Sequence, residues 1–185
     1  MKFNQSGRSM IEMLGVLAIV GILSVGGLDL VSKARRSNQM GTLISSISNL
    51  AGTIVQQRKY APEIKESYGS DIVLFLKQTG KIPTGLTIGS KKDGFYQLTG
   101  ELNSLITANL PTTDDDERTV TLSISGLDKE TCIKVVSNNW GNMSGKTAAT
   151  IKVGDGDGDK TATGQMSIAD ATAGCPNTIT LEYKL

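Results

Sequence analysis

The sequence offers few sets of side chains that could do chemistry. It has no histidine and only two cysteines, Cys132 and Cys175. Without histidine there can be no Ser-His-Asp or Cys-His hydrolase centre and no His-ligated zinc site. Two cysteines are too few for a Cys-based zinc site, and these are too far apart for a thioredoxin-like redox pair. We therefore expect that the chain is not an enzyme.

Three aspartates, Asp155, Asp157 and Asp159, alternate with glycines. Alternating carboxylates can reach one hard cation, as in the first half of an EF-hand calcium loop. However, Lys160 stands where that loop needs glycine, and Met166 where it needs a bidentate glutamate. Asp-Gly repeats are also ordinary hairpin sequence. We expect an exposed turn here, with calcium binding as the alternative, and no other cofactor.

One carboxylate, Glu12, lies near the start of a long apolar run. The residues from Met13 to Leu28 carry no charge, and Gly7 precedes Glu12 by five positions. At a helix centre in lipid, an aspartate costs on the order of 2.5–3.5 kcal/mol. Glu12 could simply extend to the lipid headgroups. We favour a partner that the carboxylate meets later, and hence a role in assembly.

The apolar run predicts a membrane helix. Residues 10–31 would span roughly 33 Å, enough to cross a bilayer core of about 30 Å. The run is longer than the apolar region of a secretory signal, and no Ala-x-Ala-like cleavage site follows it. We expect residues 8–31 to form the transmembrane half of an N-terminal helix.

The helical pattern continues beyond this segment. Apolar residues recur at steps of three and four from Met40 to Val55, which is typical of one face of an amphipathic helix. Residues 32–59 are therefore predicted to be the amphipathic half of the same helix, ending before Ala61-Pro62.

The remaining residues, 60–185, predict a globular head. Short helices are expected at residues 70–78, 101–109 and 128–138, and strands at 95–98, 119–124, 147–153, 165–168 and 178–184. The predicted fold class is α+β: a long N-terminal helix packed on a mostly antiparallel sheet with short helices.

Gly7, Glu12 and the apolar helix behind them resemble the N-terminal signature of type IV pilins and of the pseudopilins of type II secretion. The resemblance implies that residues 1–7 are a leader, which prepilin peptidase removes by cutting after Gly7. It implies methylation of the new N-terminal amine, here on Arg8, where the family usually has Phe or Met. It also implies that Glu12 faces the N-terminal amine of a neighbouring subunit in a filament.

A second resemblance concerns the head. Residues 126–132, which open a helix, are similar to the type IVb pilin subclass, in which a cysteine on such a helix pairs with one near the C-terminus. The resemblance implies a disulfide between Cys132 and Cys175. Such a bond also suits an exported chain, whereas two free thiols would suit a cytosolic one.

Together these features predict a structural subunit of a type IV pilus or pilus-like filament. The expected partners are further copies of the chain, other pilins, prepilin peptidase and the inner-membrane assembly machinery. Nucleic-acid binding is left open. Two alternatives remain: a bitopic membrane protein whose periplasmic binding head does not polymerise, and a type II secretion pseudopilin.

The expected location before assembly is the inner membrane, with the N-terminus in the cytoplasm and the head in the periplasm. After assembly it is the extracellular pilus. Lys33, Arg35 and Arg36 follow the apolar run, against Lys2 and Arg8 before it, and the positive-inside rule would favour the reverse orientation. The predicted disulfide and the resemblance both favour a head outside the cytoplasm.

Overall fold

The computed structural model describes residues 8–57, 60–69, 71–110, 119–141, 148–154 and 159–184. The chain divides into two compact units, residues 1–39 and 40–185. This division falls within the first helix, α1 (Arg8–Gln56). We refer to residues 8–39 as the N-terminal segment of α1 and to residues 40–56 as its C-terminal segment.

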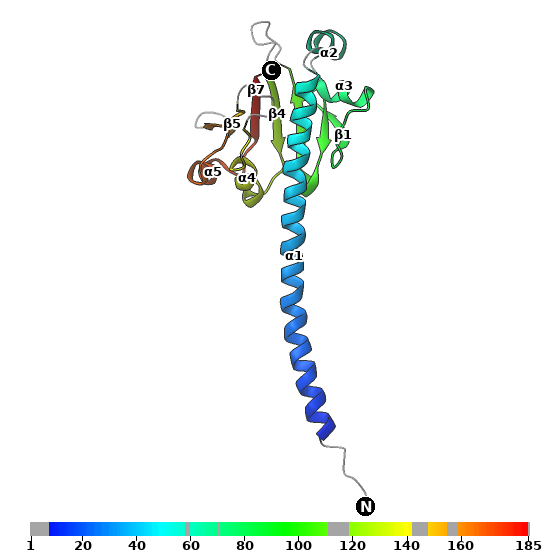
Figure 1. Ribbon diagram of the computed structural model, residues 1–185, viewed down its shortest axis with the longest axis vertical. Helices are drawn as coiled ribbons and strands as arrows, with labels where there is room; N and C mark the ends of the chain where they lie inside the picture. The colour runs from blue at the N-terminus through cyan, green and yellow to red at the C-terminus, as the bar shows by residue number, and fades with distance from the viewer. Residues whose placement is uncertain are drawn as a thin grey trace, which may run out of the picture. The chain divides into compact units, whose positions relative to one another are not determined.

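The second unit contains a seven-stranded sheet and short helices (Figure 1). The helices are α2 (Ala61–Tyr68), α3 (Ile72–Gln78), the 3-10 turn η2 (Glu101–Asn103), α4 (Lys129–Val136) and α5 (Ile168–Gly174). The strands are β1 (Thr87–Lys92), β2 (Phe95–Thr99), β3 (Leu105–Asn109), β4 (Thr119–Ser125), β5 (Thr150–Val153), β6 (Lys160–Thr163) and β7 (Ile179–Lys184). Every strand pair is antiparallel. The predicted α+β class is confirmed.

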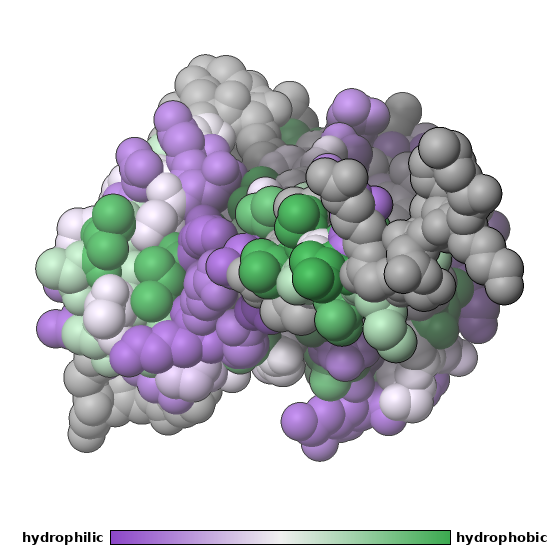
Figure 2. Space-filling model, turned by 90° about the horizontal axis from the view of Figure 1, so that it is seen from below, coloured by the Kyte–Doolittle hydropathy of each residue, from purple (hydrophilic) through white to green (hydrophobic). Residues whose placement is uncertain are grey.

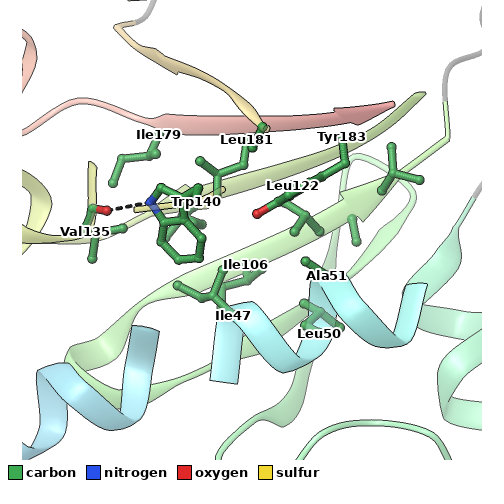
Figure 3. Close-up of a cluster of buried hydrophobic side chains, with 14 of the residues drawn as sticks. Ile47, Leu50, Ala51, Ile106, Leu122, Val135, Trp140, Ile179, Leu181 and Tyr183 are labelled. Carbon is green, nitrogen blue, oxygen red and sulfur yellow. Dashed lines mark hydrogen bonds between the residues drawn. The ribbon is translucent and has the colours of Figure 1, made fainter. Parts of the chain in front are cut away.

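The core lies between the C-terminal segment of α1 and one face of the sheet (Figure 3). The helix contributes side chains three or four positions apart, which share one face: Met40, Leu43, Ile47, Leu50, Ala51 and Ile54. The strands contribute alternate residues, because successive side chains point to opposite faces: Ile106, Ala108, Val120, Leu122, Ile124, Ile179, Leu181 and Tyr183. The predicted amphipathic stripe is therefore the surface that packs on the sheet.

Trp140 fills the centre of this core. Its side chain is fully buried, and its Nε1 donates a 2.7 Å hydrogen bond to the carbonyl of Val135 at the end of α4. Figure 3 shows the indole between α1 and the strands, on the same side of the sheet as Ile47. The core has few aromatic residues, and this one indole fills a volume that would otherwise need several aliphatic side chains.

The strand order is β1-β2-β3-β4-β7-β5-β6. β7 is inserted between β4 and β5, and it pairs with both along most of its length. The sheet edges are β1 and β6. At the first edge, β1 joins β2 through Asp93 and Gly94, whose φ angles of 52° and 89° are both positive. Asp-Gly is the preferred pair for such a two-residue hairpin turn.

Asp71 connects the sheet to α3. It is buried, and its two carboxylate oxygens accept different backbone hydrogen bonds. Oδ1 accepts from the amide of Leu74 at 3.0 Å and so caps α3, and Oδ2 accepts from the amide of Tyr96 in β2 at 2.9 Å. One side chain thus fixes the position of a helix on a strand.

Two predicted elements are wrong. Residues 101–109, predicted as a helix, form the turn η2 and then β3, which pairs with β2 and β4. Residues 165–168, predicted as a strand, lead into α5, whose cap Ser167 accepts a hydrogen bond from the amide of Asp170. For residues 101–109, pairing with strands on both sides prevails over a short helical pattern in the sequence. For residues 165–168, the prediction overlooked Ser167 as a helix cap.

Other differences concern elements that were not predicted. α2, β1, β6 and α5 have no counterpart in the prediction, and α1 ends at Gln56 rather than at residue 59. The Ala61-Pro62 pair, taken as a stop signal, opens α2 instead, with Pro62 in its first turn. Proline is favoured there because the first amides of a helix have no intrahelical acceptor.

Candidate functional site

The N-terminal segment of α1 exposes apolar side chains on all sides. Successive residues are rotated by about 100° around a helix, so consecutive and near-consecutive positions cover its whole circumference. The exposed residues are Met10, Ile11, Met13, Leu14, Val16, Leu17, Ile19, Val20, Ile22, Leu28, Leu30 and Val31. Figure 2 shows hydrophobic side chains, in green, at the surface of the molecule seen from below. A helix that is apolar all round needs cover from other molecules.

Glu12 lies within this apolar surface. Its neighbours Ile11 and Met13 are 75% and 67% exposed, and Glu12 is exposed as well. In the described part of the chain no basic group pairs with its carboxylate. By contrast, the Ser24 hydroxyl donates a 2.7 Å hydrogen bond to the Val20 carbonyl, so it needs no outside partner. Glu12 is therefore a polar group on this surface that a docking partner would have to satisfy.

Other predicted N-terminal features are only partly described. Gly7, the predicted cleavage position, lies outside the described residues, and Arg8 is the first residue of α1. The sequence also predicts a membrane helix within residues 8–31. Among the residues that the structure describes, we find no helix that combines the length and the apolar character needed to cross a membrane.

Cys132 and Cys175 form a disulfide, as the resemblance implied. Cys132 is fully buried on α4, and Cys175 follows the last residue of α5. Their Cα atoms are 5.8 Å apart, within the range that a disulfide requires. The bond joins the two short helices and holds the segment that leads into β7. Sequence reasoning placed both residues correctly.

The possible calcium site is not tested. Asp155 and Asp157 lie outside the described residues, and Asp159 is exposed. Within the described ranges no three His, Cys, Asp or Glu side chains gather in a way that could hold a metal ion. Calcium binding by these aspartates stays a prediction from the sequence.

Comparison with known proteins gives one likeness, and it is structural. No protein-family model matches the chain, and no curated protein matches it. A solved structure does: the crystal structure of a type IVb pilin from Salmonella typhi, with a TM-score of 0.52 and 18% sequence identity. The match covers 78% of this chain and 99% of that chain. The chain thus has a fold similar to that of a type IVb pilin.

Proposed function

We propose that this chain is a structural subunit of a type IV pilus or pilus-like filament. In this proposal prepilin peptidase cuts after Gly7, and the N-terminal segment of α1 then forms the filament core with those of other subunits. The observation that carries the proposal is the exposed, all-round apolar surface of residues 10–31, joined to a head with a pilin-like fold. The cover that this surface needs would come from identical helices of neighbouring subunits.

Glu12 would determine the register of this packing. Once the leader is removed, Arg8 carries a free amino group, and Glu12 would pair with the amino group of an adjacent subunit. Burying both charges costs several kcal/mol per ion, and their mutual attraction offsets this cost only when the two groups meet. A subunit shifted along the filament would leave a buried charge unpaired. The pair therefore contributes more to register than to net affinity.

The proposal includes a stage before assembly in the inner membrane, with the head in the periplasm. Support for the periplasmic head comes from the disulfide between Cys132 and Cys175, since such bonds persist in oxidising compartments. Residues 10–31 would enter the membrane at this stage. Methylation of the new N-terminus and contacts with the assembly machinery are further parts of the proposal.

The decisive experiment is a charge-only substitution, Glu12→Gln. We expect the variant to accumulate at wild-type levels with its disulfide intact, but to be lost from filaments sheared from the cell surface. The matched control is Glu66→Gln, which neutralises an exposed carboxylate on α2 in the head and should leave filaments unchanged. Mass spectrometry of the filaments would show the chain starting at Arg8, and Gly7→Ala would abolish that product.

Filaments that contain Glu12→Gln at the wild-type proportion would overturn the role of Glu12. A chain that stays in the membrane fraction and never enters filaments, even as wild type, would favour the bitopic membrane protein instead. Filaments that appear only when a type II secretion system is overexpressed would favour the pseudopilin.

A further inference from the structure

The sheet face opposite α1 carries a cavity. Its volume is about 370 Å³, and its lining comes from the end of β1, the turn after it, strands β2, β3 and β4, and the residue just before β7. The residues that line it are Lys92, Asp93, Phe95, Gln97, Leu105, Thr107, Asn109, Ser123, Ser125 and Thr178. A volume of this size is at the lower end of small-ligand sites, which span about 300–1,000 Å³.

Strand alternation explains why polar side chains gather here. Ile106, Leu122 and Ile124 point into the core, so the residues between them point to the other face. Strand pairing then brings these residues together: Thr107 lies opposite Ser123, and Leu105 opposite Ser125. The cavity floor is thus a patch of hydroxyl groups with one leucine at its side.

The polar groups of the cavity are not engaged within the protein. Across the described ranges of the chain, none of the hydroxyl or amide side chains that line the cavity hydrogen-bonds to another residue. For Asn109 this is costly, because its Oδ1 is buried and has no partner. The lining therefore has donors and acceptors that are free for a ligand.

The other lining groups limit what that ligand can be. Lys92 and Asp93 are adjacent and of opposite charge, so the rim has no net charge. An anion would find one cation beside a carboxylate, which is a poor anion site. An extended peptide would need the free backbone groups of a sheet edge, whereas β2, β3 and β4 are each paired on both sides. Phe95 and Leu105 add two apolar surfaces.

We propose that this cavity binds a neutral sugar ring of a carbohydrate. A sugar hydroxyl both donates and accepts hydrogen bonds, which matches Thr107, Ser123 and Gln97. The C–H face of the ring would lie against Phe95. This inference concerns a binding activity of the head and does not depend on filament assembly.

The test uses the full-length chain in a detergent without a sugar headgroup. The probes are methyl β-D-galactopyranoside, methyl α-D-mannopyranoside and N-acetyl-D-glucosamine, and binding is followed by saturation-transfer difference NMR and titration. We expect one probe to bind with a millimolar Kd. Phe95→Ala and Thr107→Val should each weaken its binding by about tenfold, the change that corresponds to one lost hydrogen bond or ring contact.

The matched control is Thr161→Val. Thr161 is an exposed threonine of β6 that does not line the cavity, so its change should leave the Kd unaltered. Ser123→Ala removes a smaller side chain and should weaken probe binding by less. Thermal unfolding of each variant shows whether the head is folded. The proposal is overturned if none of the probes binds to the folded wild type, or if the bound probe binds Phe95→Ala and Thr107→Val as tightly as the wild type.

Discussion

At the scale of single residues, Tyr183 is a polar group that the core leaves unsatisfied. The residue is 4% exposed, and its hydroxyl is buried with no hydrogen-bond partner. Figure 3 shows its ring extending from β7 into the core beside Leu122. Burial raises the pKa of the Tyr183 hydroxyl well above its ordinary value, because the charged phenolate would lose its hydration.

We expect Tyr183→Phe to stabilise the head by up to about 1 kcal/mol at neutral pH, because the variant no longer buries an unsatisfied hydroxyl. The effect should grow in alkali. The unfolded chain releases the tyrosine proton near pH ~10, while the folded chain retains it. The contribution of the raised Tyr183 pKa to the free energy of unfolding is thus complete below that pH and is lost as the pH rises above it. Urea unfolding of wild type and variant on both sides of pH ~10 measures the difference.

Tyr68→Phe is the control for this pair. The Tyr68 hydroxyl is exposed and donates to Gln78 Oε1 at 3.0 Å, so its loss should cost a few tenths of a kcal/mol. If wild type and Tyr183→Phe lost stability in parallel above pH ~10, the alkaline loss of stability would not come from Tyr183.

Single residues were predicted best where the neighbouring sequence, or the lack of any other candidate partner, pointed to one role. Glu12 was conspicuous as a carboxylate in an apolar run, and the two cysteines had only each other as disulfide partners. Tyr183 and Asp71 were missed, because burial and the direction of a side chain depend on tertiary packing. The cavity was missed because Leu105, Thr107 and Asn109 lay in a predicted helix, and because the polar residues of an expected strand do not by themselves predict a cavity.

At the scale of elements, Asp71 should matter more than an ordinary cap. We expect Asp71→Ala to lower the free energy of unfolding by about 2–4 kcal/mol, since the amides of Leu74 and Tyr96 both lose their acceptor. Ser167→Ala removes the cap of α5 and an exposed hydrogen bond from the Ser167 hydroxyl to Asp170 Oδ2, and it should cost about 1 kcal/mol. Chemical denaturation of the two variants compares the costs.

Equal losses in the two variants would show that the bond to Tyr96 adds nothing. Asp71→Asn gives a finer comparison, since it keeps one acceptor oxygen and replaces the other by an N–H₂ donor. Its loss should lie between that of wild type and Asp71→Ala.

Long and strongly periodic elements could be predicted from the sequence, and short ones could not. The stripe from Met40 to Ile54 and the alternation in β4 were both evident, because each repeats several times. Residues 101–109, which form η2 and β3, were predicted as one helix. Leu102 and Asn103 adopt positive φ angles of 57° and 58°, and no pattern in the sequence predicts this. The hairpin between β1 and β2 did have a readable signal, since Asp93-Gly94 is a favoured turn pair.

At the scale of the whole molecule, the disulfide should be a main source of stability. It joins residues 43 positions apart, which restricts the unfolded chain by about 4 kcal/mol in the chain-entropy model. We expect the double variant Cys132→Ala/Cys175→Ala to have a free energy of unfolding in guanidinium that is lower by a similar amount. Reduced wild type is the control, because it lacks the bond but keeps both side chains. A double variant as stable as the oxidised wild type would contradict the expectation.

The position of β7 has a consequence for the time at which the head can form. β5 and β6 come earlier in the chain, yet they connect to β4 only through β7. While the polypeptide is still emerging from a ribosome or a translocation pore, these two strands can pair with each other but cannot join β4, and a two-stranded hairpin is marginal in water. The seven-stranded sheet is therefore complete only when β7 becomes available to pair with both β4 and β5.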